Sequence, residues 1–175
     1  YSVDTSAADI VERRARIFFT ATRMCWQLDS SDWDLLHWAA RSHEIGMAIS
    51  HKHFNRHSAY LLRNADLPGF SQEEQEQMAI LVQGHRGKLK EELLAEIPDL
   101  ERPRMLRLLT IIRLATSFKY VEALEQLPDF TIEATERTLT LSFPEGWLAQ
   151  HPLTAQELEQ EQRVLAKLGL ELATC

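Results

Sequence analysis

Three histidines, His43, His57 and His85, each lie on the apolar side of a different expected helix, and Glu44 directly follows the first of them. A buried imidazole needs a hydrogen-bond partner, because an unpaired polar atom away from water costs free energy. Imidazoles and a carboxylate that converge from separate helices can also hold a metal ion or bind phosphate. The pattern therefore leaves two interpretations open: a ligand pocket, or core histidines hydrogen-bonded to carbonyls or to Glu44.

Basic residues gather around these histidines although the net charge of the chain is −7. That charge argues against a nucleic-acid partner, but a local basic zone can still attract a smaller anion. A guanidinium group can donate two parallel hydrogen bonds to phosphate oxygens. An arginine next to a histidine in a helix, however, points about 100° away from that histidine. We expect a polyanion or phosphate site formed by Arg41, Lys52, His53, Arg56, His57, His85, Arg86 and Lys88.

Five helices are expected to position these side chains. The first runs from a cap at Asp4 or Thr5 to about Leu28, with Ile10, Ile17, Ala21, Met24 and Leu28 on its apolar face. The others run from Ser31 or Asp32 to near Gly46, from about His57 to Asn64, from the capping box of Ser71 and Glu74 to Gly87, and from Arg104 to about Val121. An acidic linker or short helix precedes the last.

The helix from Arg104 has one narrow polar stripe and is apolar nearly all round the rest, which predicts a central place in the bundle. The stripe is expected to face solvent rather than a polyanion. Its members are Arg104, Arg107, Thr110, Arg113 and Ser117. The four tryptophans are too scattered to form a stacking platform.

After this helix the hydrophobic period changes. The runs FTIEA and TLTLSF alternate apolar and polar residues and predict a β-hairpin, with a turn at Thr135 to Arg137. A helix from Thr154 to about Leu168 follows, and LEL is a possible third strand. The expected fold is mainly α, with a helical bundle over residues 1–125 and a small α+β subdomain over residues 126–175.

The two cysteines cannot form a disulfide framework, which favours a cytoplasmic setting. No signal peptide or membrane span is expected, since the longest apolar run is interrupted by Arg113. The chain begins at Tyr1, and we interpret it as a piece of a longer protein.

The spacing of HEIG, the later histidine helices and the run IIRLATSF resembles the HD-domain phosphohydrolase superfamily. The resemblance places the degenerate HD positions at His43, Glu44, His57 and His85. Two metal ligands of that superfamily have no counterpart: the closing Asp falls at or near Thr116, and residues 9–23 contain no opening histidine. We therefore expect no metal and no catalytic residue in this chain.

A closer resemblance is to the C-terminal half of bacterial exopolyphosphatases and guanosine pentaphosphate phosphohydrolases. The runs HSAYLLRNADLPGF and LTLSFPEGWLAQHPL carry it, and it covers nearly the whole chain. It implies a degenerate HD-like bundle that binds inorganic polyphosphate and contributes to a homodimer. It also implies N-terminal actin-like domains that supply the catalytic Glu and Mg²⁺, so the isolated chain should be inactive.

Within this family the GHR run favours exopolyphosphatase, and the guanosine pentaphosphate hydrolase stays the alternative. Two other classes remain open. One is a stand-alone, metal-dependent HD phosphohydrolase, which metal analysis would reveal. The other is a structural dimerisation module, which would not bind polyphosphate.

Overall fold

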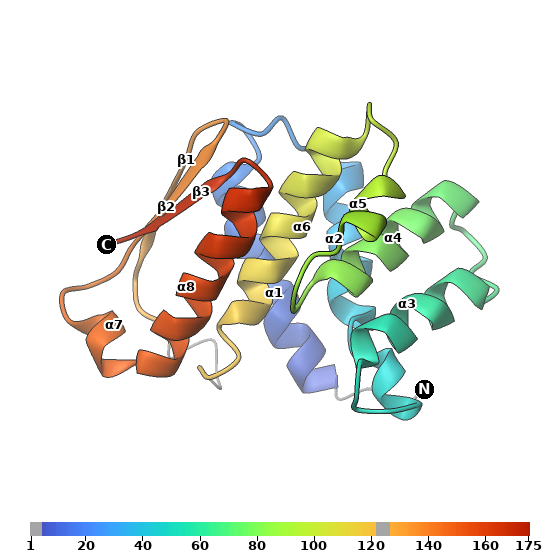
Figure 1. Cartoon of the computed structure of the whole chain (residues 1–175), viewed down its shortest axis with the longest axis horizontal. Coiled ribbons are helices and arrows are strands. Elements are labelled where there is room, and N and C mark those ends of the chain that lie inside the picture. The colour runs from blue at the N-terminus through green and yellow to red at the C-terminus, as the bar shows by residue number, and fades with distance from the viewer. Residues whose placement is uncertain (1–4, 122–126) are drawn as a thin grey trace.

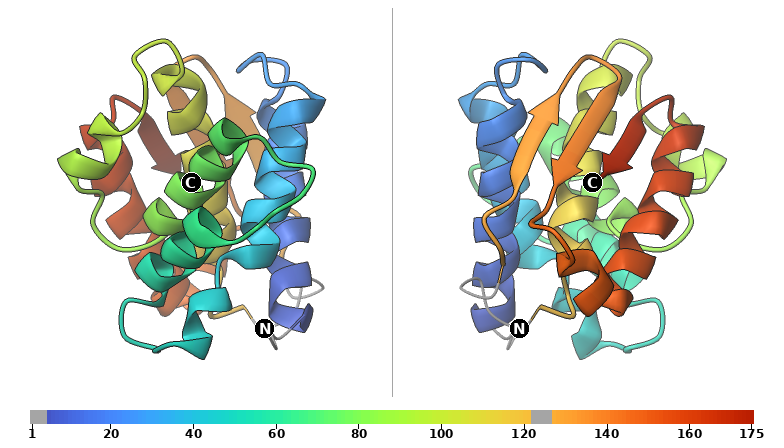
Figure 2. Two further views of the ribbon diagram at one scale, coloured as in Figure 1. Left: turned by 90° about the vertical axis from the view of Figure 1, so that its right-hand side faces the viewer. Right: turned by 90° about the vertical axis from the view of Figure 1, so that its left-hand side faces the viewer.

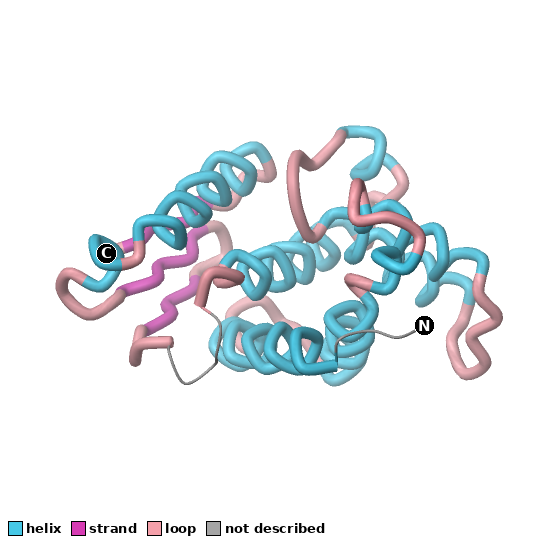
Figure 3. Tube along the Cα trace, turned by 90° about the horizontal axis from the view of Figure 1, so that it is seen from below, coloured by secondary structure: helices cyan, strands magenta, loops and turns pink. Residues whose placement is uncertain are grey.

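The computed structural model describes residues 5–121 and 127–175. A bundle of helices occupies most of the molecule, and a three-stranded sheet lies at one end (Figures 1 and 3). The bundle contains α1 (Thr5–Thr22), α2 (Ser30–Ser42), the 3-10 helix η1 (Ile45–Ala48), α3 (Phe54–Asn64), α4 (Gln72–Gly84), α5 (Glu91–Ala95) and α6 (Arg102–Ser117). The remaining elements are β1 (Thr131–Ala134), β2 (Thr138–Ser142), α7 (Trp147–Gln150), α8 (Pro152–Lys167) and β3 (Glu171–Thr174). The predicted fold class, mainly α with a small α+β C-terminal part, is confirmed.

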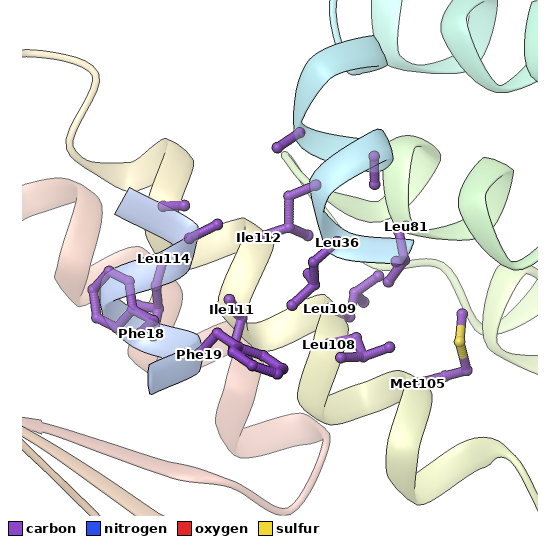
Figure 4. Close-up of a cluster of buried hydrophobic side chains, with 14 of the residues drawn as sticks. Phe18, Phe19, Leu36, Leu81, Met105, Leu108, Leu109, Ile111, Ile112 and Leu114 are labelled. Carbon is purple, nitrogen blue, oxygen red and sulfur yellow. The ribbon is translucent and has the colours of Figure 1, made fainter. Parts of the chain in front are cut away.

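Helix α6 lies at the centre, as its nearly all-round apolar sequence predicts. It packs against α1, α2, α4 and α8. The core close-up shows α6 side chains, among them Leu109 and Ile112, between Phe18 and Phe19 of α1 on one side and Leu36 and Leu81 of α2 and α4 on the other (Figure 4). Burial of each of these large apolar side chains contributes about 1.5–3 kcal/mol to the stability of the bundle.

Two helices of the bundle begin at capping boxes. Ser71 and Glu74 cap α4 as predicted. In α2 the cap is Asp29 rather than Ser31 or Asp32, because the Asp29 carboxylate accepts the backbone N–H groups of both of these residues. Asp32 occupies the third helical position and bonds back to the N–H of Asp29.

The predicted apolar face of α1 is wrong. The helix ends at Thr22 instead of Leu28, and Ile17 and Met24 are 38% and 83% exposed. The buried face, which repeats at steps of three and four residues, contains Ala8, Val11, Arg14, Ala15, Phe18, Phe19 and Thr22. The prediction considered apolar residues alone, and it missed this face because Arg14 and Thr22 are polar and yet buried.

The C-terminal elements form the predicted hairpin, helix and third strand. β1 pairs antiparallel with β2, and β2 pairs parallel with β3, so α8 crosses over between two neighbouring parallel strands. Leu139 and Leu141 are buried, while alternate residues of β2 are half-buried. The sheet lies in front of the helices in the right panel of Figure 2, and it packs against α1 and α8. The short helix α7 was not predicted.

The predicted domain boundary at residues 125 and 126 involves residues outside those described, and the division stays a prediction. Buried apolar side chains on both sides of it belong to one cluster, which includes Leu114 and Phe118 of the bundle end and Leu158 and Leu172 of the C-terminal part. In the described ranges no helix is long and apolar enough to cross a membrane.

Candidate functional site

A cleft of about 850 Å³ lies where the bundle meets α8, which we call the central cleft. Its volume falls within the range of small-ligand sites. Its walls come from α1, from the segment His43–Met47 with Phe54, from the segment His85–Lys88, from the C-terminal end of α6 with the residues that follow it, and from α8. Segments far apart in the sequence therefore share one surface.

His43 and His85 form the floor of the central cleft. Each residue is 97% buried, and their rings meet edge to face with centroids 5.1 Å apart. Nδ1 of His43 lies 2.6 Å from the carbonyl oxygen of Ala40, and Nδ1 of His85 lies 2.6 Å from that of Val82. Since a carbonyl only accepts, each Nδ1 carries the proton, and each neutral ring keeps Nε2 as an acceptor.

Burial holds both imidazoles in the neutral form. It lowers the pKa of His43, against a smaller opposing effect of the Ala40 carbonyl and of Glu44. It lowers the pKa of His85 further, and the neighbouring His43 ring adds to this lowering. Both rings therefore offer a lone pair at neutral pH.

The turn between α2 and α3 places Glu44 beside these rings. Gly46 packs so closely on α3 that a Cβ would lie 2.3 Å from Phe54 O and from Ser58 N, so only glycine fits. The Ser58 hydroxyl fixes the same turn, because it accepts the N–H of Gly46 and donates to the carbonyl of His43. Oε1 of Glu44 consequently lies 3.6 Å from Nε2 of His43, on the cleft wall.

The polar stripe of α6 does not face solvent as expected. Arg113 is 1% exposed and donates to both carboxylate oxygens of Glu161 at 2.8 Å, and to the carbonyls of Gly84 and Gly87 at 2.6 and 2.8 Å. Arg104 pairs with the buried Asp32 at 2.7 Å. These pairs show that the stripe joins α6 to α8, α4 and α2.

Seven basic residues line the central cleft against three acidic ones. Arg14 and Arg113 are buried within the walls, whereas Arg86, Lys88, Lys119, Arg163 and Lys167 are exposed at the rim. Of these five, Lys119 pairs with Glu157 and Arg86 lies 4.6 Å over the ring of Phe54. The lining of the central cleft is thus predominantly basic, in a protein that carries a net charge of −7.

The structure brings together only part of the predicted phosphate site. His85, Arg86 and Lys88 line the central cleft, as do the degenerate HD positions His43 and Glu44. The other predicted residues, Arg41, Lys52, His53, Arg56 and His57, do not line it.

Those five residues have other surroundings. Arg41 binds Asp9 at 2.6 Å and Glu12 at 3.0 Å, so its charge is neutralised. Lys52, His53 and Arg56 are exposed where η1 leads into α3, and His57 is half-buried in α3. His57 therefore does not converge with the other two histidines.

Thr116, at the position of the missing closing Asp, does lie beside this histidine pair. Its hydroxyl is 3.2 Å from the carbonyl of His85, and it lines the central cleft. Across residues 5–121 and 127–175, no three His, Cys, Asp or Glu side chains are placed to hold a metal ion. A hydroxyl that already bonds to carbonyls of its own helix is a weak replacement for a carboxylate ligand.

The sequence matches the family model described as Ppx/GppA phosphatase, domain III, over residues 1–162. It is also 34% identical to the guanosine-5'-triphosphate,3'-diphosphate pyrophosphatase of Pseudoalteromonas translucida (strain TAC 125), over 98% of this chain and 35% of that protein. The chain belongs to the Ppx/GppA phosphatase family. It spans about a third of the length of this curated relative.

For this member of the Ppx/GppA family, sequence reasoning missed five cleft cations: Arg113, which was expected to face solvent, and Arg14, Lys119, Arg163 and Lys167. They lie on α1, on α6 and just after it, and on α8, far in sequence from the histidine-rich segment. Arg14 carried one usable signal, an arginine on the helical face of Val11, Ala15 and Phe18. Its guanidinium donates to the carbonyls of Phe118 and Val121 at the C-terminal end of α6.

Proposed function

We propose that this chain is the anion-binding domain of a phosphohydrolase that removes a phosphate from guanosine pentaphosphate, and that the central cleft holds the phosphate groups. The observation that carries the proposal is the rim of exposed cations around one cleft, in a chain 34% identical to a guanosine pentaphosphate pyrophosphatase. The sequence analysis favoured exopolyphosphatase over the guanosine pentaphosphate hydrolase, and the proposal reverses this preference. The relative's name supports the pentaphosphate hydrolase.

In the proposed enzyme, hydrolysis takes place elsewhere, in N-terminal actin-like domains that hold Mg²⁺ and a catalytic Glu. The central cleft would supply binding energy and position the anionic substrate by charge-assisted hydrogen bonds. The protein would act in the cytoplasm as a homodimer. The isolated chain is expected to hydrolyse neither guanosine pentaphosphate nor polyphosphate.

Inorganic polyphosphate stays the second candidate, because a row of cations on one rim also suits a chain of phosphates. Lys88, Arg163 and Lys167 form no ion pair with any described residue, so their charge is available to such a ligand. Binding to either anion should weaken as salt rises, because cations released from the ligand enter the bulk solution.

The test compares two double charge reversals with the same change in net charge. Lys88→Glu with Arg163→Glu alters the rim, and Lys52→Glu with Arg56→Glu alters exposed residues outside the central cleft. Calorimetric titration with guanosine pentaphosphate and with polyphosphate should show a loss of roughly tenfold or more for the rim variant only. Equal losses in both variants would show that net charge, and not the cleft, decides binding.

A further inference from the structure

The floor of the central cleft presents hydrogen-bond acceptors, whereas its rim presents cations. His43 and His85 donate through Nδ1 to backbone carbonyls, so each keeps an Nε2 lone pair. The carboxylate of Glu44 lies beside His43, at a distance of 3.6 Å that exceeds a hydrogen bond. No described residue donates to any of these acceptors.

A phosphate chain does not suit this floor. The oxygens of ionised phosphate are acceptors, and acceptors placed against a carboxylate and two imidazole lone pairs repel them. A ligand that satisfies the whole cleft must carry N–H donors at one end and phosphate at the other. Adenine brings one amino group next to the acceptor N1, whereas guanine brings N1–H and the 2-amino group side by side.

The surrounding walls suit a flat base. Phe54 lies against His85 with ring centroids 5.8 Å apart, and Val11 and Met47 line the same cleft. The exposed Arg86 guanidinium lies 4.6 Å over the ring of Phe54, so the rim cations begin at the edge of this apolar wall. A base read through its Watson–Crick edge between apolar walls is a common form of nucleotide recognition.

We propose that Glu44, His43 and His85 recognise the Watson–Crick edge of guanine, so that the central cleft binds a guanosine polyphosphate with its phosphates toward the rim. The inference rests on the proposed function, in which the rim cations hold phosphate. It adds a specificity that phosphate binding alone does not provide, namely guanine over adenine and over a bare phosphate chain.

The test is calorimetric titration of the 175-residue chain, whose hydrophobic core is formed within its own residues, with GTP, ATP and tripolyphosphate. GTP and ATP carry the same triphosphate, so the rim treats these two alike, and tripolyphosphate reports phosphate binding without a base. Hydrogen bonds to a charged group contribute enough to give GTP an affinity at least about tenfold above that of ATP. Glu44→Gln should remove this preference and leave tripolyphosphate binding within about threefold of wild type.

The matched control is Glu157→Gln, which makes the same chemical change in a cleft residue on α8 that pairs with Lys119. It should keep the GTP preference. Equal binding of all three ligands, with loss in the rim variant, overturns guanine recognition and leaves the proposed function standing. Failure of all three to bind overturns both. A GTP preference that survives Glu44→Gln assigns the selectivity to another site and also overturns the inference.

Discussion

Replacing Arg113 by methionine is expected to destabilise the chain strongly. The guanidinium is buried and makes four hydrogen bonds, two to Glu161 and one each to the carbonyls of Gly84 and Gly87. Methionine fills much of the same space but leaves the Glu161 carboxylate, whose side chain is 10% exposed, without its counter-charge. Removing one partner of a buried pair typically costs about 3–5 kcal/mol.

The measurement is urea unfolding followed by tryptophan fluorescence, together with the melting temperature. For a chain of this length each kcal/mol shifts the melting temperature by roughly 2–4 °C, so Arg113→Met should lower it by about 6–20 °C. Lys119→Met is the matched control. Its ion pair with Glu157 also joins the end of α6 to α8 but is exposed, and it should cost less than about 1 kcal/mol.

The double variant Arg113→Met, Glu161→Met separates the orphaned charge from lost packing. With no buried carboxylate left unpaired, it should be more stable than Arg113→Met alone. An Arg113→Met variant within about 1 kcal/mol of wild type would refute the reasoning, as would a double variant whose losses simply add.

Three further outcomes are expected. Because burial lowers the pKa of His85, the His85 side chain becomes protonated in the unfolded chain before it does so in the folded chain as the pH falls. The stability present at neutral pH should therefore decline below about pH 6.5, by up to about 1.4 kcal/mol per pH unit. In urea titrations from about pH 7.5 to about 5.5, the free energy of unfolding of His85→Asn should depend less steeply on pH than that of the wild type. An unchanged slope would contradict this. Gly46→Ala should cost about 3 kcal/mol because its Cβ meets α3 backbone at 2.3 Å, whereas Gly69→Ala, with φ +98° and open space, should cost about 1 kcal/mol in the same titration. Ser58→Ala removes two buried hydrogen bonds and should cost about 2 kcal/mol, with faster hydrogen exchange at the Gly46 amide; unchanged exchange would show that the hydroxyl does not hold the turn.

The elements with strong local signals were predictable from the sequence. The capping box at Ser71, the alternating strands around Leu139 and the helix α6, which is apolar outside one narrow polar stripe, each follow from a short-range pattern, and the structure contains all three. The face of α1 was not predictable from apolar residues alone. Arg14 can be buried because carbonyls after the end of α6 accept hydrogen bonds from its guanidinium, and those carbonyls lie more than 100 residues away in sequence.

The lining of the central cleft was only partly predictable for the same reason. The charge pattern along the chain grouped Arg41 and Arg56 with residues that line the cleft, such as Arg86. Arg41 is instead neutralised by Asp9 and Glu12 of α1, a pairing that requires α1 and α2 to lie side by side. Conversely, Arg163 reaches the central cleft only because α8 packs against α6. Linear charge clusters identify basic segments, and tertiary packing decides which of these charges remain available to a ligand.

The two interpretations of the histidines, core residue or pocket residue, are not exclusive. His43 and His85 are almost wholly buried and bonded to carbonyls, as the core interpretation requires, yet both line the central cleft, as the pocket interpretation requires. The hydrogen bond from Nδ1 to a backbone carbonyl reconciles the two interpretations, because it fixes the tautomer and leaves Nε2 as a hydrogen-bond acceptor. Thr116, whose hydroxyl lies 3.2 Å from the carbonyl of His85, stands beside a floor of two neutral imidazole acceptors and the Glu44 carboxylate.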